Sequence, residues 1–301
     1  MKQAHICLDE TLGVRYAILP GDPARLDRVA AQLESVRELA YNREFRSLTG
    51  TYKGVPVLAV STGIGGSSAG ICVEELHNIG VEAAIRIGSC GALQTDIAPG
   101  ELLIAAGAVR DDGTSRAYVR EGYPAVPDTE LLLALTESIR AQDFAHRLGI
   151  IRSHESFYID DIEEINEYWS KKGVLGSDME TAALLTVGRL RGMKCASVLN
   201  NVVRWKECIS HGVGSYAAGA DAAVLEDFQH PFAAAAGKEA ISRIHIAVGV
   251  EAAGQVEPEG DDQGRPAKGV KKKRRRPIER RQKQADDQAD EGEEQDGPAE
   301  I

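Results

Sequence analysis

The chain of 301 residues contains no apolar run close to the roughly 18 residues that a membrane span needs, so we expect no transmembrane segment. Its first residues lack the apolar core of a signal peptide. Five cysteines without paired spacing do not predict a disulfide framework, and no cysteine and histidine cluster has the spacing of a zinc site. Because free thiols are typical of reducing compartments, we expect a cytoplasmic protein without membrane contact.

The chain also lacks an excess of positive charge. Its formal net charge of -11 is the opposite of what a nucleic-acid-binding protein needs overall. From about residue 254 apolar residues nearly vanish, and a basic block (residues 271–276) precedes an acidic one (residues 286–294). Such a segment cannot bury enough apolar surface to offset its ordering entropy. We therefore predict a folded domain over residues 1–253 and a disordered tail over 254–301, whose basic block is either solvated or a contact for nucleic acid or an anionic surface.

Short β-rich runs alternate with helical patterns up to about residue 200. The runs that we interpret as buried strands cover residues 16–19, 55–61, 83–87, 102–106 and 196–199. Helical patterns cover residues 24–33, 67–78, 129–141, 162–172 and 180–191, and a last one covers 237–252. This alternation predicts an α/β domain in which helices pack on the faces of a sheet.

The most informative segment is residues 86–92 (RIGSCGA), which place Arg86 at the end of an apolar run and directly before a small-residue turn. A fixed guanidinium and several backbone N–H groups then point to one place, as the binding of a phosphate or carboxylate requires. Gly21 follows a predicted strand and opens a helix, where its missing Cβ lets the backbone approach an anion. Arg25, one helical turn further on, can reach back over that loop. Small residues and acids also combine in residues 177–182 (SDMETA).

Together these segments resemble the nucleoside phosphorylase family that includes uridine phosphorylase and the hexameric bacterial purine nucleoside phosphorylases. The resemblance runs from about residue 5 to about residue 201. Residues 61–66 (STGIGG), 73–76 (VEEL) and 123–126 (YPAV) are similar to the uridine branch, and residues 50–54 (GTYKG) and 89–91 (SCG) to the purine branch. The resemblance implies a single α/β domain with a central mixed, twisted sheet flanked by helices. It also implies phosphorolysis of a nucleoside to base and ribose 1-phosphate, with inorganic phosphate as co-substrate and no required cofactor.

The same resemblance implies roles for individual residues. Phosphate would be bound by Gly21, Arg25, Arg43, Arg86 and Ser89. The ribose would be bound by His5, Met179 and Glu180, and catalysis would depend on Arg86 and Glu180. The base would be bound by Cys90, Gly91, Phe157, Asn200 and Asn201.

Two of these residues, His5 and Arg43, would come from a neighbouring subunit. The minimal active unit would then be a homodimer, and the hexamer of the family is the expected assembly. The resemblance also implies a potassium ion between subunits, held at Glu44, Ile64 and Ser68, although a salt bridge from Glu44 would explain that glutamate equally well.

The predicted base pocket departs from the family. In typical uridine phosphorylases the Phe–Tyr pair that matches Phe157 and Tyr158 is followed by a glutamine and an arginine that contact uracil. This chain has neither residue after the pair. Asn200 and Asn201 stand where the purine branch carries a proton-donating aspartate. An asparagine amide can donate to a carbonyl and accept from a ring N–H. This favours uracil or a 6-oxopurine over adenine, and His154 and Glu155 lie close enough in sequence to contribute.

Uridine is therefore the first choice of substrate, as in a divergent uridine phosphorylase, with 2′-deoxyuridine or thymidine also open. A 6-oxopurine nucleoside, inosine or guanosine, is the alternative. A nucleosidase, which uses water, and a non-catalytic nucleotide-binding protein are the rival functions. The set of arginines favours phosphorolysis, because a nucleosidase needs no basic phosphate site.

Overall fold

The structure, a computed structural model, describes residues 1–207. The helical stretch predicted over 237–252 and the predicted tail over 254–301 lie outside the described residues. The strands are β1 (Tyr16–Pro20), β2 (Glu34–Asn42), β3 (Phe45–Tyr52), β4 (Val55–Val60), β5 (Ala83–Ala92), β6 (Leu102–Asp111), β7 (His146–His154), β8 (Gly176–Asp178) and β9 (Lys194–Val203). The α-helices are α1 (Leu26–Ala30), α2 (Gly66–Asn78), α3 (Gly113–Tyr118), α4 (Thr129–Ala141), α5 (Ile162–Ser170) and α6 (Thr181–Leu190), and short 3-10 helices cover Glu10–Leu12 and Pro23–Arg25.

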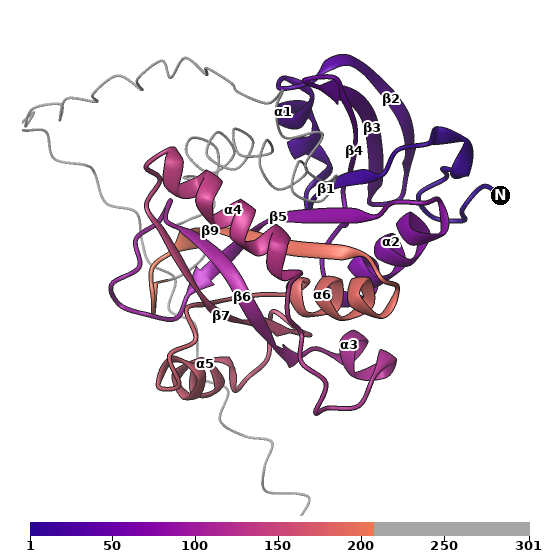
Figure 1. Cartoon of the computed structure of the whole chain (residues 1–301). Helices are drawn as coiled ribbons and strands as arrows, with labels where there is room; N and C mark the ends of the chain where they lie inside the picture. The colour runs from indigo at the N-terminus through magenta and orange to yellow at the C-terminus, as the bar shows by residue number, and fades with distance from the viewer. Residues whose placement is uncertain (208–301) are drawn as a thin grey trace, which may run out of the picture. The chain divides into compact units, whose positions relative to one another are not determined.

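Within the described part of the chain, the nine strands form one mixed sheet in the order β2-β3-β4-β1-β5-β8-β7-β6-β9 (Figure 1). β5 pairs in parallel with both β1 and β9, whereas β8 joins its end in antiparallel fashion. Because β5 contacts β9 as well as β8, the half of the sheet from β5 to β9 closes on itself. The mixed sheet flanked by helices that the resemblance implied is thus confirmed.

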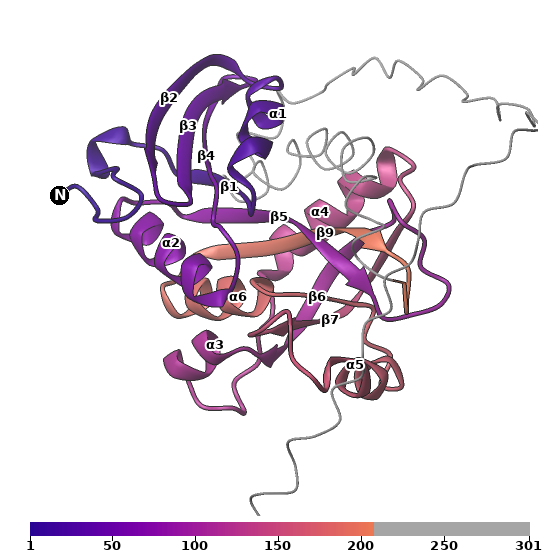
Figure 2. The same cartoon turned by 180° about the vertical axis from the view of Figure 1, so that it is seen from behind.

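Helices cover both faces of the sheet (Figures 1 and 2). On one face, Leu26 of α1 and Leu131 of α4 are buried with strand side chains in a continuous apolar cluster. On the other face α2 and α6 lie side by side, and their Val73 and Leu184 join a second cluster. A third cluster, which includes Cys90 of β5, lies among the strands of the closed half.

Two local features explain where helices begin. The side chain of Asp128 accepts a hydrogen bond from Leu131 N at 2.9 Å, which satisfies one of the unpaired N–H groups at the start of α4. The loop before α2 turns through Gly63 and Gly65, whose φ angles of 69° and 93° favour glycine. This loop follows the carboxyl end of β4, so it lies beside the ends of the neighbouring parallel strands.

The small-residue turn predicted after Arg86 is wrong. β5 continues from Ala83 to Ala92, because its backbone pairs with β9 as far as Gly91 and then with β8. The helix predicted over residues 24–33 is also wrong in extent, since it is a short 3-10 turn followed by the five-residue α1.

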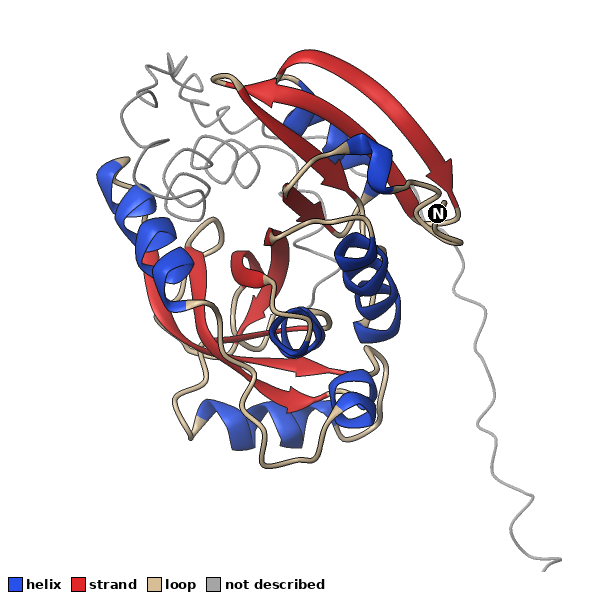
Figure 3. Ribbon diagram, turned by 45° about the vertical axis from the view of Figure 1, so that its right-hand side comes forward, coloured by secondary structure: helices blue, strands red, loops and turns tan. Residues whose placement is uncertain are grey.

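Several elements lie outside the predicted set, namely β2, β3, β7, β8 and α3. Figure 3 shows β2 and β3 as long curved strands, and most side chains of β2 are exposed. The other predicted strands and helices are confirmed to within a few residues at each end, except that β5, β6 and β9 are longer than expected.

Candidate active site

A cavity of about 1310 Å³ lies at the carboxyl ends of β1 and β5. Ligands of α/β sheets bind at this edge, because the loops that follow the parallel strands meet there. The lining combines the loop after β1, the second half of β5, the segment 177–180, helix α5 and the residues that follow β9.

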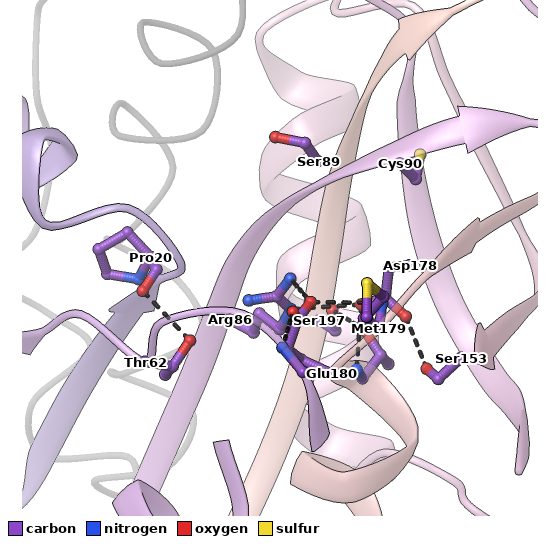
Figure 4. A network of polar contacts seen from close by, with 12 residues as sticks. Pro20, Thr62, Arg86, Ser89, Cys90, Ser153, Asp178, Met179, Glu180 and Ser197 are labelled. Carbon is purple, nitrogen blue, oxygen red and sulfur yellow. Dashed lines mark hydrogen bonds and ion pairs between the residues drawn. The ribbon is translucent and has the colours of Figure 1, made fainter. Parts of the chain in front are cut away.

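The centre of the site is a buried cluster of one arginine and two carboxylates (Figure 4). Arg86 is 4% exposed; its Nε donates to Asp178 Oδ2 at 3.3 Å, and its Nη2 donates to Glu180 Oε2. A charge on a buried strand is costly unless it is paired and hydrogen-bonded, and here both carboxylates are themselves buried. The cluster therefore fixes a guanidinium at the cavity wall.

Glu180 is held at both of its oxygens. Gly65 N donates to Oε1 at 2.6 Å, while Met179 N donates to Oε2 at 3.3 Å. Burial raises the pKa of the Glu180 carboxyl, whereas the Arg86 guanidinium acts in the opposite direction. The carboxylate is thus oriented by the loop before α2 as well as by the arginine.

Asp178, to which sequence analysis assigned no role, anchors the cluster. Ser153 Oγ donates to its Oδ1 at 2.6 Å, and Thr181 donates to Oδ2 from its backbone N at 3.0 Å and its hydroxyl at 2.7 Å. Asp178 thereby satisfies the backbone N–H of Thr181, the first residue of α6, and offers Arg86 Nε a fixed acceptor. The sequence offered one sign of this role, since Asp178 stands two residues before Glu180 in residues 177–182 (SDMETA).

The predicted phosphate residues of this chain lie together. Arg25 Nη2 donates to Ser89 Oγ at 2.5 Å, and Arg25, Ser89, Gly21 and Arg86 all line the cavity. A Cβ on Gly21 would stand 3.8 Å from Arg86 Nη1 and 3.3 Å from Gly63 O. The backbone at Gly21 therefore lies close to both Gly63 and Arg86, with little room for a side chain.

The predicted base site is brought together only in part. Cys90, Gly91 and Phe157 line the cavity, as does Met179. Burial raises the pKa of the Cys90 thiol, so its sulfur is a neutral wall of the cavity.

The structure does not bring Asn200 and Asn201 to the cavity. Both lie within β9, buried between β5 and β6, and Asn201 Nδ2 donates to Ala98 O at 2.9 Å. The physical reason is the length of β9, which continues to Val203 and keeps both amides inside the sheet.

His5 and Arg43 do not line the cavity of their own chain either. His5 Nδ1 lies 2.7 Å from Glu75 Oε1, and Arg43 occupies the tight turn between β2 and β3 with a φ of 56°. Of the predicted potassium ligands, Glu44 and Ile64 line the cavity, and Ser68 Oγ donates to Glu44 Oε1 at 2.7 Å. That hydroxyl is the main cause of the lowered pKa of Glu44.

Helix α5 contributes lining residues that sequence analysis missed: Ile162, Glu163, Asn166 and Glu167. Positions three and four apart share one face of a helix, so the spacing of 162/163 and 166/167 was a usable signal. The last two residues of β9 and the four that follow it, together residues 202–207, also line the cavity. Among residues 1–207 no group of three or more His, Cys, Asp or Glu residues could hold a metal ion, and no helix of this part is long and apolar enough to cross a membrane.

Comparison with known proteins gives consistent results. The model of the phosphorylase superfamily matches residues 15–241. The chain is 40% identical over 216 residues to uridine phosphorylase of Thermococcus kodakarensis, which covers 66% of this chain and 78% of that protein. It is 37% identical over 197 residues to guanosine phosphorylase of Halorubrum lacusprofundi, which covers 65% and 81%. The crystal structure of uridine phosphorylase from Vibrio fischeri ES114 superposes with a TM-score of 0.70 at 45% identity and covers 75% of this chain and 96% of that chain.

Proposed function

Since the chain belongs to the phosphorylase superfamily, we propose that it catalyses the reversible phosphorolysis of a nucleoside, uridine in the first place, to free base and ribose 1-phosphate. The observation that carries this proposal is the buried Arg86–Asp178–Glu180 cluster beside Gly21, Arg25 and Ser89 in one cavity. Guanidinium groups and a closely approaching backbone suit a phosphate, and the carboxylate suits ribose hydroxyls.

In the proposed reaction a phosphate oxygen forms a bond to C1′ while the C1′–N glycosidic bond breaks. The electron pair of that bond leaves with the base, and the proton of hydrogen phosphate ends on the base nitrogen. Positive charge builds on the sugar as the bond lengthens, as in other glycosyl transfers. The Glu180 carboxylate, held by Gly65 N and Arg86, stabilises that charge and the ribose hydroxyls without reorganising. No covalent enzyme intermediate is required.

The choice of uridine is supported by the uridine phosphorylases among the similar proteins, at 34–40% identity over about two thirds of this chain. Guanosine is the second candidate, because the guanosine phosphorylase of Halorubrum lacusprofundi is 37% identical. Uracil and guanine share one feature, a ring N–H next to a carbonyl group. A site that forms hydrogen bonds with this N–H and this carbonyl can bind either base, provided that the cavity is wide enough for a purine.

Turnover of uridine, thymidine, inosine, guanosine and adenosine with and without phosphate tests this function. We expect phosphate-dependent release of base, fastest from uridine, and loss of activity in Arg86→Ala. Base release at the same rate without phosphate would instead indicate a nucleosidase. Nucleoside binding without turnover would indicate a binding protein.

We propose that the active unit is a homodimer, within a hexamer, because His5 and Arg43 lie outside the cavity of their own chain and would act in a neighbour's site. Mixing inactive Arg86→Ala with inactive Arg43→Ala subunits tests this. A shared site regains part of the activity in mixed dimers, whereas a self-contained site regains none.

We also propose a potassium ion held by the Glu44 carboxylate, the Ile64 carbonyl and the Ser68 hydroxyl, since oxygen donors suit a hard cation and Glu44 and Ser68 are in contact. Activity that is unchanged when potassium is replaced by a bulky organic cation would contradict this site.

The remaining proposals concern location and the tail. A cytoplasmic location fits the thiols of Cys7, Cys72, Cys90 and Cys195, all of which are free. A catalytic domain over residues 1–253 with a dispensable tail predicts that truncation near Gly254 leaves activity largely intact. If the truncated protein lost binding to nucleic acid, the basic block would be a contact site after all.

A further inference from the structure

His154, Asn166 and Phe157 all line the cavity, and a hydrogen-bond partner orients both His154 and Asn166. His154 Nδ1 lies 2.9 Å from Ser156 O. Because a carbonyl oxygen only accepts hydrogen bonds, Nδ1 carries the proton and Nε2 of the neutral ring is an acceptor. Among the described residues this is the one hydrogen bond that the imidazole makes, and burial lowers the pKa of His154, which keeps the ring neutral.

Asn166 is oriented by an arginine. Arg152 Nη1 donates to Asn166 Oδ1 at 3.0 Å, and a guanidinium only donates, so the amide oxygen must face Arg152. The Asn166 Nδ2 group then carries two donors on the opposite side. Arg152 is 2% exposed and is itself fixed by Asp111 Oδ2, which lies 2.8 Å from its Nε.

Both side chains line one cavity, and strand β7 helps to position each of them. Arg152 and His154 are two residues apart on β7, so they project from the same face about 7 Å apart. Asn166 of α5 meets Arg152 from the facing helix. The ring of Phe157 lies 6.3 Å from that of His154, centroid to centroid, and offers a flat surface for a base.

We propose, resting on the phosphorolysis proposed above, that His154 and Asn166 determine base specificity. His154 Nε2 accepts a hydrogen bond from a ring N–H of the base, and Asn166 Nδ2 donates to the carbonyl next to it. This pattern matches N3–H and a neighbouring carbonyl of uracil, and N1–H and O6 of a 6-oxopurine. Cytosine and adenine present the reverse pattern, a ring acceptor beside an amino group, and are rejected.

The test compares nucleosides that differ in the one N–H. The wild-type protein should turn over uridine at least roughly 10- to 100-fold better than 3-methyluridine in kcat/KM, and inosine better than 1-methylinosine by a similar factor. His154→Phe keeps the aromatic packing but removes the acceptor. We expect kcat/KM for uridine to fall roughly 10- to 100-fold and the preference over 3-methyluridine to shrink towards unity.

Asn166→Asp is the second variant, because it keeps an oxygen for Arg152 and replaces the donor by an acceptor. We expect a fall in uridine kcat/KM of at least about tenfold with an unchanged phosphate KM. The matched control is His146→Phe, since His146 lies on the same strand, has Nδ1 2.8 Å from Phe144 O, and is absent from the cavity lining. This control should retain wild-type kinetics.

The outcomes separate the two proposals. Equal turnover of uridine and 3-methyluridine by the wild type overturns the proposed role of His154 and Asn166 alone. An undiminished preference of His154→Phe for uridine over 3-methyluridine does the same. A wild-type preference for adenosine or cytidine also overturns it. If no nucleoside is turned over in a phosphate-dependent way, the proposed function is overturned, and with it the proposed role of His154 and Asn166.

Discussion

Asp178→Asn tests whether the buried cluster depends on this carboxylate. Asp178 accepts hydrogen bonds from Ser153 Oγ at 2.6 Å, from Thr181 at 3.0 and 2.7 Å, and from Arg86 Nε at 3.3 Å. Asparagine keeps the shape but offers only one oxygen. With that oxygen facing Thr181 and Arg86, the amide nitrogen meets the Ser153 hydroxyl, and the negative charge beside Arg86 is lost.

A lost charge-assisted hydrogen bond costs about 1.5–3 kcal/mol, and Glu180 still balances Arg86, so we expect a loss of stability of about 2–3 kcal/mol. With a urea dependence of about 2–3 kcal/mol per molar, the unfolding midpoint should fall by about 1 M. Both proteins are unfolded at the same concentration, since association would shift the midpoint. The phosphate KM should rise as well, because Arg86 loses one of the two groups that aim it.

The control is Asp96→Asn. Asp96 also pairs with an arginine, Arg147 at 2.8 Å, but its side chain is 68% exposed. Exposed pairs contribute about 0–1 kcal/mol, so this midpoint should move by at most about 0.5 M, half or less of the shift in Asp178→Asn. If Asp178→Asn moved the midpoint no further than Asp96→Asn, the reasoning about the buried cluster would be refuted.

Three further predictions concern the same site. In Gly88→Ala the new Cβ would stand 2.4 Å from Leu199 Cδ2 and 2.9 Å from Arg86 Nη2, so the phosphate KM should rise about tenfold or more. The control is Gly91→Ala, whose Cβ would stand 3.3 Å from Val203 Cγ1 and should change the phosphate KM only slightly. Equal effects of the two variants in steady-state kinetics would contradict this reasoning. Glu180→Gln should lower kcat by about 10²-fold or more, and a change below about threefold would show that its charge is not used in the transition state. Burial lowers the pKa of His154 in the folded protein below its ordinary 6.5. As the pH falls below 6.5, the unfolded chain therefore binds more protons than the folded one, and the free energy of unfolding decreases until the pH reaches the lowered pKa. This decrease is at most about 1.4 kcal/mol per pH unit. The urea midpoint should therefore decline less steeply in His154→Phe than in the wild type between about pH 7.5 and 5.5, and equal slopes would exclude the effect.

The parts of the fold that sequence analysis predicted are those with a strong local pattern. The helix over residues 129–141 agrees at both ends, because Asp128 caps it and apolar residues recur along one face. The buried strand β1 was recognisable as a short apolar run. β2 was missed because it is an edge strand whose polar, mostly exposed side chains do not alternate, and its position depends on pairing with β3 rather than on its own sequence.

The site was predicted where a motif carries its own geometry. Gly21, Arg86 and Glu180 were predicted from motifs that combine small residues with charges, and the structure places all three on one cavity. Asn200 and Asn201 were placed by analogy with a loop, and the extension of β9 that buries them depends on long-range pairing with β5. His154 and Asn166 line one cavity because Arg152 of β7 binds Asn166 of α5, a long-range contact that no local pattern encodes.

The double pairing of β5 has a consequence for the exchange of amide hydrogens. Residues 83–87 of this strand are hydrogen-bonded to β1 on one side and to β9 on the other. The amides around Arg86 can therefore exchange with solvent only when the middle of the sheet separates, an opening close to global unfolding in free energy. Gly65, which donates its N–H to Glu180, lies instead in a loop that can open without breaking a strand pair. In deuterated solvent the arginine end of the cluster would be the last part of the site to take up label and the Gly65 end among the first, and bound phosphate and nucleoside would slow the loop far more than the strand.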